Sequence, residues 1–350
     1  MKQPADFVQD LAQLAAQATS SYSALKNLGE VSVGACERRA IYREQKVTLY
    51  RYQALTEQTV KRPLLIVYAL VNRPYMADLQ PGRSLIQGLL EQGIDVYLLD
   101  WGYPDGADRG LSLNDYINGY LDHCVDVVRR RCGVESINLL GICQGGTFSL
   151  CYTALHRQRV ANLITTVTPV DFQTPGDLLS HLVRHIDIDN IVQCCGNVSG
   201  DMLNAMFLSL KPFKLVAQKY LDLLDLGDDE DALRNFMRME KWIFDSPDLA
   251  GTAFAEFVGA CYQRNALVKG ELLIGGEAVD LSTLELPILN IYARDDHLVP
   301  PAASRALSAH VGSLDYQELE FPGGHVGIYV SGRARAMLPP AIGDWLRARD

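Results

Sequence analysis

The sequence lacks several features that would place it in common protein classes. Its 350 residues include 32 Lys and Arg against 42 Asp and Glu, a net charge of −10, so it has no basic excess to attract nucleic acid. The longest apolar run is about residues 64–71, far short of the about 20 residues that a membrane-spanning helix needs. We therefore expect neither nucleic-acid binding nor a transmembrane segment.

A signal peptide and a disulfide framework are also lacking. No apolar core of sufficient length follows the first residues, Met1–Asp6. The eight cysteines form no Cys-x-x-Cys pair and no cluster with histidine of the kind that holds zinc. We therefore expect a cytoplasmic protein that binds no metal and whose cysteines are mostly free thiols.

The sequence does contain short apolar segments that alternate with helical patterns. Buried strands are predicted at residues 64–70, 95–100, 137–140, 163–167, 287–293 and 316–321. Helices are predicted at residues 84–91, 113–131, 147–156 and 302–310, and at the end of the chain. Strands that alternate with helices indicate a mostly parallel central sheet with helices on both faces.

The alternation stops from about residue 172 to residue 263, where the pattern is mainly helical. We interpret this stretch as a cap inserted into one α/β domain. The apolar residues before residue 30 have near-helical spacing and predict an amphipathic helix. The predicted parts are an N-terminal helical segment at 1–40, the first part of the core at 41–171, the cap at 172–263 and the second part of the core at 264–350.

The motif that carries chemistry is Gly141-Ile142-Cys143-Gln144-Gly145, which directly follows a predicted strand and precedes a helix. This arrangement is typical of the nucleophile elbow of the α/β-hydrolase fold, with cysteine in place of serine. The sharp turn requires small residues on both sides, and the N-terminus of the following helix favours a thiolate. The alternative is a buried cysteine in a glycine-rich turn. We predict that Cys143 is the nucleophile.

A nucleophile of this kind needs a base and a group that orients the base. In this fold they follow in the order nucleophile, acid, histidine. His325 comes just after the last predicted strand, and the adjacent pair Asp295 and Asp296 comes just after the preceding strand. Position alone leaves both aspartates open, and His297 is a candidate supporting residue beside them.

The other histidines have weaker signals. His123, His156 and His310 fall within helical patterns, where structural roles are more common. His181 and His185 have the i, i+4 spacing of some metal ligands, but no third ligand is evident nearby in the sequence.

The oxyanion of an acyl-transfer reaction needs two backbone N–H groups. The first is expected from Gln144, directly after the nucleophile, and the second from the loop after the strand at residues 64–70. Val71 and Asn72 are the candidates in that loop, and Val71 is our first choice.

With these residues identified, the chain resembles the catalytic subunit of polyhydroxyalkanoate synthases, most closely the short class III type. The resemblance runs through most of the chain. The stretches that carry it lie at Tyr68–Pro74, Leu99–Gly102, Gly141–Gly146, Met239–Trp242, Asp296–Pro300 and Gly323–His325.

The resemblance implies a catalytic triad of Cys143, Asp296 and His325, and so favours Asp296 over Asp295. It implies an acyltransferase that polymerises (R)-3-hydroxyacyl-CoA, above all 3-hydroxybutyryl-CoA, and releases CoA through a cysteine thioester. A serine ester would hold the acyl group in a less reactive form. CoA is part of the substrate, and we expect no cofactor.

The same resemblance implies a second synthase subunit as partner and an association with polyhydroxyalkanoate granules in the cytoplasm. We also expect a homodimer of the catalytic subunit. Two alternatives stay open: a thioesterase or polyester depolymerase that uses Cys143, and an inactive scaffold on a storage granule.

Overall fold

The computed structural model describes residues 20, 25, 26, 28–213, 218–226 and 229–350. The chain divides into two compact units, which are Met1–Val33 with Asp201–Ser246, and Gly34–Gly200 with Pro247–Asp350. We call them unit 1 and unit 2. The amphipathic helix predicted before residue 30 lies almost wholly outside the described residues.

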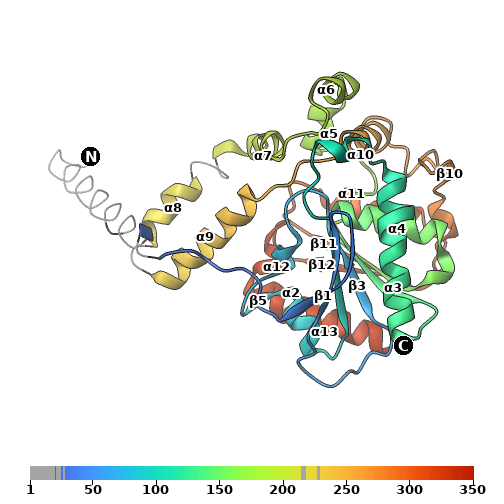
Figure 1. Cartoon of the computed structure of the whole chain (residues 1–350), viewed down its shortest axis with the longest axis horizontal. Coiled ribbons are helices and arrows are strands. Elements are labelled where there is room, and N and C mark those ends of the chain that lie inside the picture. Colours follow the sequence, from blue (N-terminus) through green and yellow to red (C-terminus); the bar gives the residue numbers. More distant parts are fainter. Residues whose placement is uncertain (1–19, 21–24, 27, 214–217, 227–228) are drawn as a thin grey trace. The chain divides into compact units, whose positions relative to one another are not determined.

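Unit 2 is built on an eight-stranded sheet with the order β1-β2-β6-β3-β7-β8-β11-β12 (Figure 1). Its strands are β1 (Arg38–Glu44), β2 (Val47–Tyr52), β3 (Leu64–Val67), β6 (Val96–Asp100), β7 (Ile137–Ile142), β8 (Val160–Thr166), β11 (Ile288–Ala293) and β12 (Tyr316–Phe321). All pairs from β6 to β12 are parallel, whereas β2 pairs antiparallel with both β1 and β6. The predicted mostly parallel sheet is confirmed. Every residue of β3, β6, β7 and β11 is buried, which explains their continuous apolar sequences.

Strands β1 and β2 have no counterpart in the sequence prediction. β1 is an edge strand with charged and partly exposed residues at most positions, so it has no continuous apolar run. The boundary predicted at residue 40, between a helical segment and the core, falls inside this strand. Pairing along the sheet, rather than local sequence, produces the extended conformation here.

The helices of unit 2 connect and cover the strands, and short 3₁₀ and π segments join them. They are α2 (Leu85–Glu91), α3 (Asp122–Cys132), α4 (Gln144–Leu155), α5 (Leu178–Val183), α6 (Ile188–Cys195), α10 (Gly251–Phe257), α11 (Pro301–Arg305), α12 (Gly327–Val330) and α13 (Gly332–Arg347). The 3₁₀ segments are η1 (Pro74–Ala77), η2 (Gly106–Gly110), η4 (Arg157–Arg159), η7 (Leu281–Thr283) and η8 (Ala306–Ala309), and the π-helices are η3 (Asp115–Leu121) and η6 (Val258–Gln263). Two short hairpins complete the unit, β4 (Asp78–Gln80) with β5 (Arg83–Ser84) and β9 (Leu273–Ile274) with β10 (Glu277–Ala278).

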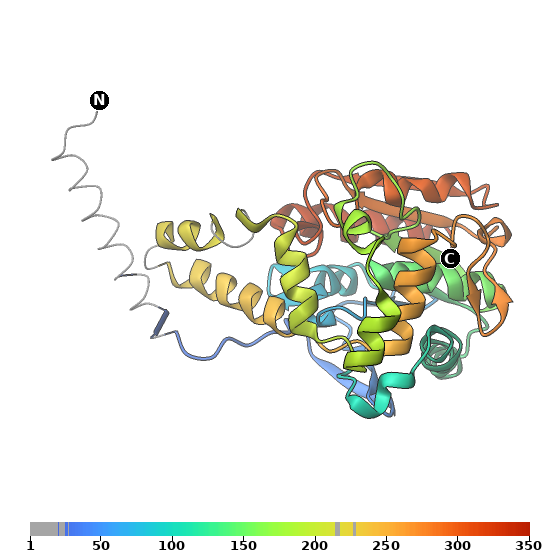
Figure 2. The ribbon, with the colours of Figure 1, turned by 90° about the horizontal axis from the view of Figure 1, so that it is seen from above.

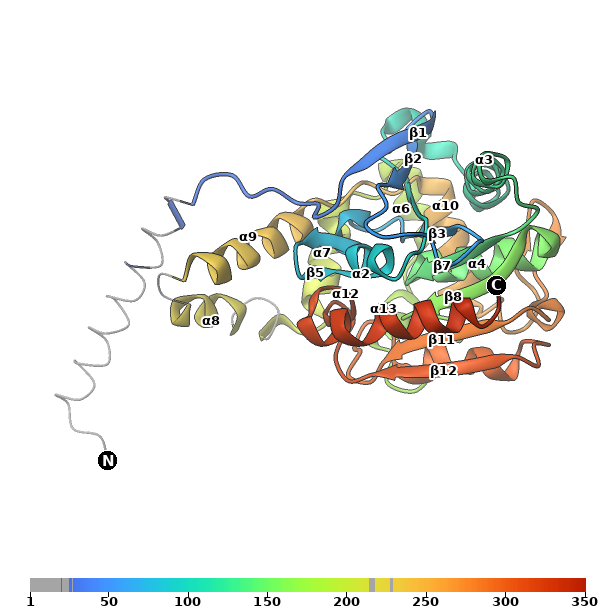
Figure 3. The same cartoon turned by 90° about the horizontal axis from the view of Figure 1, so that it is seen from below.

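Two helix contacts show how tightly unit 2 is packed. Helices α2 and α13 lie side by side (Figure 3), and a Cβ at Gly88 would come within 2.3 Å of the Pro339 ring. Helix α10 starts against the end of α6 (Figure 2), where a Cβ at Gly251 would lie 2.0 Å from the carbonyl oxygen of Gly196. Glycine at positions 88 and 251 permits these close approaches.

The stretch predicted as a cap, residues 172–263, is mainly helical, and it is divided between the two units. Helices α5, α6 and α10 belong to unit 2, whereas α7 (Gly200–Ser209), α8 (Lys219–Asp225) and α9 (Glu230–Phe244) lie almost entirely in unit 1. That residues 172–263 act as one inserted cap stays a prediction.

Unit 1 has a small hydrophobic core of its own. Leu28, Val31 and Leu233 are buried together, and side chains of α8 and α9 pack against them. The pair Lys219–Glu240 joins α8 to α9 with a distance of 2.7 Å. Residues near the N-terminus are therefore held by helices more than 180 positions later in the chain.

No helix in the described residues is long and apolar enough to cross a membrane.

Candidate active site

The loop after β7 places Cys143 at a sharp turn before α4. Its backbone has φ 54° and ψ −125°, a region that residues other than glycine rarely occupy. The residue on one side is the last of a fully buried strand, and the residue on the other begins the helix. Cys143 is only partly buried. The turn therefore presents the thiol at the carboxyl end of the sheet, where parallel α/β proteins carry their sites.

The glycines around this turn are required by space. A Cβ at Gly145 would lie 2.2 Å from the carbonyl oxygen of Val67, and one at Gly146 would lie 1.8 Å from Oγ1 of Thr168. A Cβ at Gly141 would lie 2.4 Å from the Cα of Gly146. The helix can begin directly after the nucleophile only because these three positions carry no side chain. This also explains why α4 begins at residue 144 rather than at the predicted residue 147.

Asp296 and His325 come together from two separate loops. Asp296 follows β11, His325 follows β12, and Nδ1 of His325 lies 2.7 Å from Oδ2 of Asp296. The other carboxylate oxygen of Asp296 accepts hydrogen bonds from the backbone N–H groups of Leu298 and Val299 at 2.8 and 2.9 Å. The two backbone N–H groups thus hold one oxygen of Asp296 in place, while its other oxygen bonds to His325.

The neighbouring carboxylate is placed differently. Asp295 is exposed and forms an ion pair with Arg294. The choice of Asp296, which the sequence alone left open, agrees with the hydrogen bond to His325.

His325 also interacts electrostatically with Cys143, so the imidazole is influenced both by the carboxylate of Asp296 and by the thiol. Because Nδ1 is bonded to Asp296, Nε2 is the ring nitrogen left for a proton transfer. Burial by itself lowers the pKa of His325, but its interactions with Asp296 and Cys143, including the hydrogen bond with Asp296, outweigh this effect and raise the pKa well above its usual value. The site therefore favours a protonated imidazole at His325.

The loop after β3 is held close to the start of α4. The side-chain Oε1 of Gln144 accepts a hydrogen bond of 3.0 Å from the backbone N–H of Leu70. Within the described residues, the backbone N–H groups of Val71 and Gln144 donate to no protein atom. Asn72, the second candidate, has a positive φ of 58°. That Val71 and Gln144 form an oxyanion hole stays a prediction, and the position of the Gln144 side chain agrees with it.

Buried polar contacts fix the same loop from the side of β6. Arg73 pairs with Asp100 at 2.8 Å and also donates to the carbonyl oxygen of Gly102 at 2.6 Å. Nε1 of Trp101 donates to the carbonyl oxygen of Tyr68 at 2.8 Å. Residues from two of the stretches that carry the family resemblance therefore act together as a support for this loop.

Three tyrosines are influenced by the thiol, and the sequence analysis did not single out any of them as a site residue. Tyr68, Tyr262 and Tyr329 each interact electrostatically with Cys143. Tyr329 follows His325 by four positions, a helical spacing that could have drawn attention to it.

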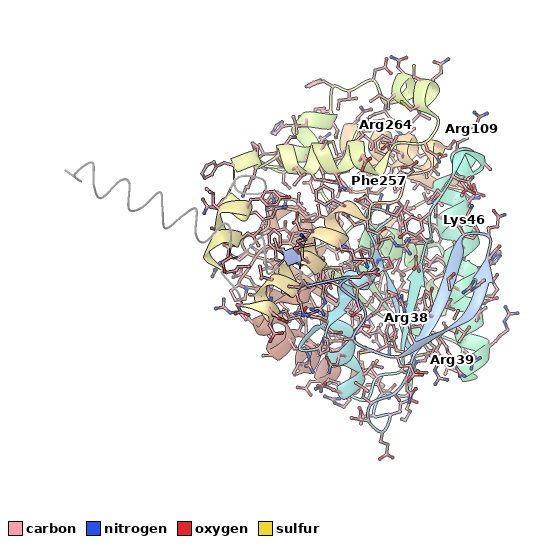
Figure 4. The ribbon with its side chains drawn as sticks, turned by 60° about the vertical axis from the view of Figure 1, so that its left-hand side comes forward. Arg38, Arg39, Lys46, Arg109, Phe257 and Arg264 are labelled. Atoms are coloured by element: carbon pink, nitrogen blue, oxygen red, sulfur yellow. The ribbon has the colours of Figure 1, made fainter. Side chains whose placement is uncertain are left out.

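Tyr262 belongs to an aromatic cluster beside the site. Its ring lies 4.8 Å from that of Phe172 and 5.9 Å from that of Phe257, and Phe257 in turn lies 5.8 Å from Phe148 of α4. Figure 4 shows Phe257 among the helices of unit 2, while the labelled Arg39, Lys46, Arg109 and Arg264 are exposed. An apolar wall of this kind suits an acyl chain.

The remaining histidine candidates show no sign of metal binding within the described part of the chain. His181 and His185 are both exposed, and the described residues contain no group of three or more His, Cys, Asp or Glu side chains that could hold a metal ion. His297 is partly buried next to Asp296, and its supporting role stays a prediction.

A mostly parallel sheet, a strained nucleophile turn and an Asp–His pair on later loops define the α/β-hydrolase class, and residues 62–331 match the family model for the alpha/beta hydrolase fold. A monoacylglycerol lipase of Paleococcus ferrophilus superposes with TM-score 0.54 at 16% identity, over 86% of this chain and 99% of that one. A putative lipase from Sulfolobus solfataricus superposes with TM-score 0.56 at 13% identity, over 89% of this chain and 93% of that one. These likenesses concern the fold alone.

Comparison with sequence relatives assigns the chain to one family within the α/β-hydrolase class. Residues 2–89 match the model for the N-terminus of poly-beta-hydroxybutyrate polymerase (PhaC). The poly(3-hydroxyalkanoate) polymerase subunit PhaC of Allochromatium vinosum is 57% identical over 329 residues, covering 93% of this chain and 92% of that one. The subunit of the same name from Thiocystis violacea is 52% identical, covering 99% of this chain and 98% of that one. The one from Synechocystis sp. is 53% identical, covering 92% of this chain and 87% of that one. The chain belongs to the family of poly(3-hydroxyalkanoate) polymerase PhaC subunits.

Proposed function

We propose that this polymerase links (R)-3-hydroxyacyl groups, above all 3-hydroxybutyryl groups, from CoA thioesters into polyhydroxyalkanoate by way of a thioester on Cys143. Polymerisation follows from membership of the family. The observation that carries the cysteine step is the hydrogen bond of His325 with Asp296, combined with the electrostatic interaction of His325 with Cys143.

In the first half-reaction His325 takes the proton of the Cys143 thiol. The thiolate attacks the carbonyl carbon of the substrate, a new carbon–sulfur bond forms, and the carbon–sulfur bond to CoA breaks. The proton held on His325 passes to the departing CoA thiolate. Because one thioester replaces another, the exchange is nearly isoenergetic and the acyl group stays reactive.

In the second half-reaction the 3-hydroxyl of another unit attacks the thioester on Cys143. An ester carbon–oxygen bond forms, the carbon–sulfur bond breaks, and His325 takes the hydroxyl proton and returns it to the thiolate. The hydrogen bond between Asp296 and Nδ1 supports a role of Asp296 in orienting His325. Direct activation of the hydroxyl by Asp296 is the alternative.

Hydrolysis of the same thioester would make the enzyme a thioesterase. His325 is only 8% exposed, and the Asp296 side chain is fully enclosed, so the base is largely shielded from bulk water. This burial favours transfer to a bound hydroxyl over transfer to water.

We further propose a second synthase subunit as partner, a homodimer of the catalytic subunit, and action at the surface of polyhydroxyalkanoate granules in the cytoplasm. The relatives are named as subunits of a polymerase, which supports the partner. The reaction as written needs no cofactor, since the CoA thioester itself supplies the leaving group.

The test supplies 3-hydroxybutyryl-CoA to the purified chain, with and without a class III partner subunit, and measures released CoA, insoluble polymer and free hydroxy acid. We expect polymer and CoA together, no polymer with Cys143→Ala or His325→Ala, and little with Cys143→Ser. Cys194→Ala, which changes an exposed cysteine of α6, is the matched control and should behave as the wild type.

Two results would contradict the proposal. CoA release with free acid as the only product would show a thioesterase. Turnover that persists in Cys143→Ala would remove the cysteine from the mechanism.

A further inference from the structure

Tyr329 carries a buried hydroxyl whose hydrogen-bonding capacity the protein leaves unused. The residue lies on α12, is 2% exposed, and its hydroxyl oxygen has no hydrogen-bond partner among the protein atoms of the described residues. A buried polar group without a partner costs about 1–3 kcal/mol. Such a group calls for an explanation, and a ligand that completes the bond is one.

The hydroxyl lies at the catalytic site. The ring of Tyr329 meets the ring of His325 edge to face, with centroids 6.3 Å apart. Its phenol interacts electrostatically with Tyr68, Cys143 and Asp296. Burial first, and then these three groups, raise the pKa of Tyr329 well above its usual value, so the hydroxyl keeps its proton and acts as a donor.

The substrate class of the proposed function, on which this inference rests, offers two oxygens near the reacting carbon. One is the carbonyl oxygen of the thioester, for which the N–H groups of Val71 and Gln144 are available. The other is the oxygen on carbon 3, which is a hydroxyl in the monomer and an ester oxygen in the growing chain. It can accept a hydrogen bond in both states.

We propose that the Tyr329 hydroxyl donates a hydrogen bond to the oxygen on carbon 3 of the acyl group carried by Cys143. Tyr329 is then the residue that selects 3-hydroxyacyl groups over plain acyl groups. Sites that hydrogen-bond a substrate hydroxyl discriminate strongly against the analogue that lacks it. The contact also holds the acyl chain in one rotamer relative to the thioester. This orientation presents the carbonyl carbon to the next hydroxyl.

The test compares 3-hydroxybutyryl-CoA with butyryl-CoA in single-turnover release of CoA. The full-length chain is used with its partner subunit, as wild type and as Tyr329→Phe. We expect the variant to acylate roughly 10- to 100-fold more slowly with the hydroxylated substrate. The rate with butyryl-CoA should change by less than about threefold, so that the preference for the hydroxylated substrate is largely lost.

Two further tyrosine variants make the comparison specific. Tyr316→Phe removes a hydroxyl that already accepts a hydrogen bond from Asn290, and it should leave the preference unchanged. Tyr68→Phe removes one of the two other phenols that interact electrostatically with Cys143, and it should also keep the preference. A loss of preference in Tyr68→Phe instead of Tyr329→Phe would overturn the assignment.

Folding is checked by thermal unfolding of the same proteins. Because the hydroxyl of Tyr329 has no protein partner, Tyr329→Phe should unfold at the same temperature as the wild type or higher. A marked drop in this temperature, or equal slowing with both substrates, would show a structural or water-bound hydroxyl and refute the proposal.

The two proposals fail in different ways. A wild type that makes polymer while Tyr329→Phe keeps its preference refutes only the role of Tyr329. A wild type that releases free acid instead of polymer contradicts the proposed function, and the inference falls with it.

Discussion

At the scale of single residues, the carboxylate of Asp296 helps to raise the pKa of the neighbouring His325. Asp296 is bonded on one side to two backbone N–H groups and on the other to His325. Its charge is a main cause of the raised pKa of His325. A histidine with a raised pKa stabilises the folded state fully below its ordinary pKa of about 6.5, and this contribution is lost as the pH rises through the raised value.

We therefore predict a pH-dependent cost for Asp296→Asn. The substitution should lower the free energy of unfolding most below about pH 6 and less at about pH 9. The difference between these two losses should be about 1.4 kcal/mol for each unit by which the substitution lowers the pKa of His325. Denaturant unfolding at a series of pH values measures it. Asp295→Asn, on an exposed neighbouring carboxylate, is the control and should show no such trend. A cost for Asp296→Asn that grows with pH would contradict the sign.

At the scale of elements, the junction of β7 and α4 depends on the absence of side chains. The Cβ of an alanine at position 145 would approach three backbone atoms, the carbonyl oxygen of Val67 at 2.2 Å and the carbonyl carbon and oxygen of Tyr68, both at 2.6 Å. Backbone in a buried strand cannot move aside as the end of a flexible side chain can.

Gly145→Ala should therefore lower the free energy of unfolding by about 1–3 kcal/mol and displace the loop that follows β3. Because that loop supplies Val71, polymer formation should fall by more than the loss of folded protein explains. Gly332→Ala at the start of α13, where nothing lies within 4 Å of the added Cβ, is the control. Wild-type stability and activity in Gly145→Ala would contradict the steric account.

At the scale of the whole molecule, the division into two units has a measurable consequence. Leu233 is fully buried in the core of unit 1 with Leu28 and Val31. Leu233→Ala should weaken this unit by about 2–5 kcal/mol, because it leaves a cavity. We expect faster amide hydrogen exchange in α9, with little change in β3, β7 and β8 of unit 2.

The matched comparison is Leu139→Ala, in the fully buried β7 of unit 2. It should speed exchange throughout the sheet. Equal acceleration of the sheet amides by Leu233→Ala would show that the two units unfold as one.

Local sequence was sufficient for much of this fold. The central strands are buried on both faces, so their apolar runs stand out, and β12 begins and ends at the predicted residues 316 and 321. Strand β1, at one edge of the sheet, and its neighbour β2 were missed because charged and polar residues interrupt both and leave no continuous apolar run. The segment predicted as one helix at 113–131 begins with a π-helix, η3, a distinction that apolar spacing does not report.

The sequence by itself determined the motif around Cys143 and the order in which Cys143, Asp296 and His325 follow the strands, because both depend on residues near in the chain or on fixed strand order. Only the tertiary structure decided which side chains meet. The hydrogen bond between Asp296 and His325 and the one between Leu70 and Gln144 join positions on different elements. The same packing buries the hydroxyl of Tyr329. Such contacts are set by the packing of loops at one end of the sheet, and no local pattern encodes that packing.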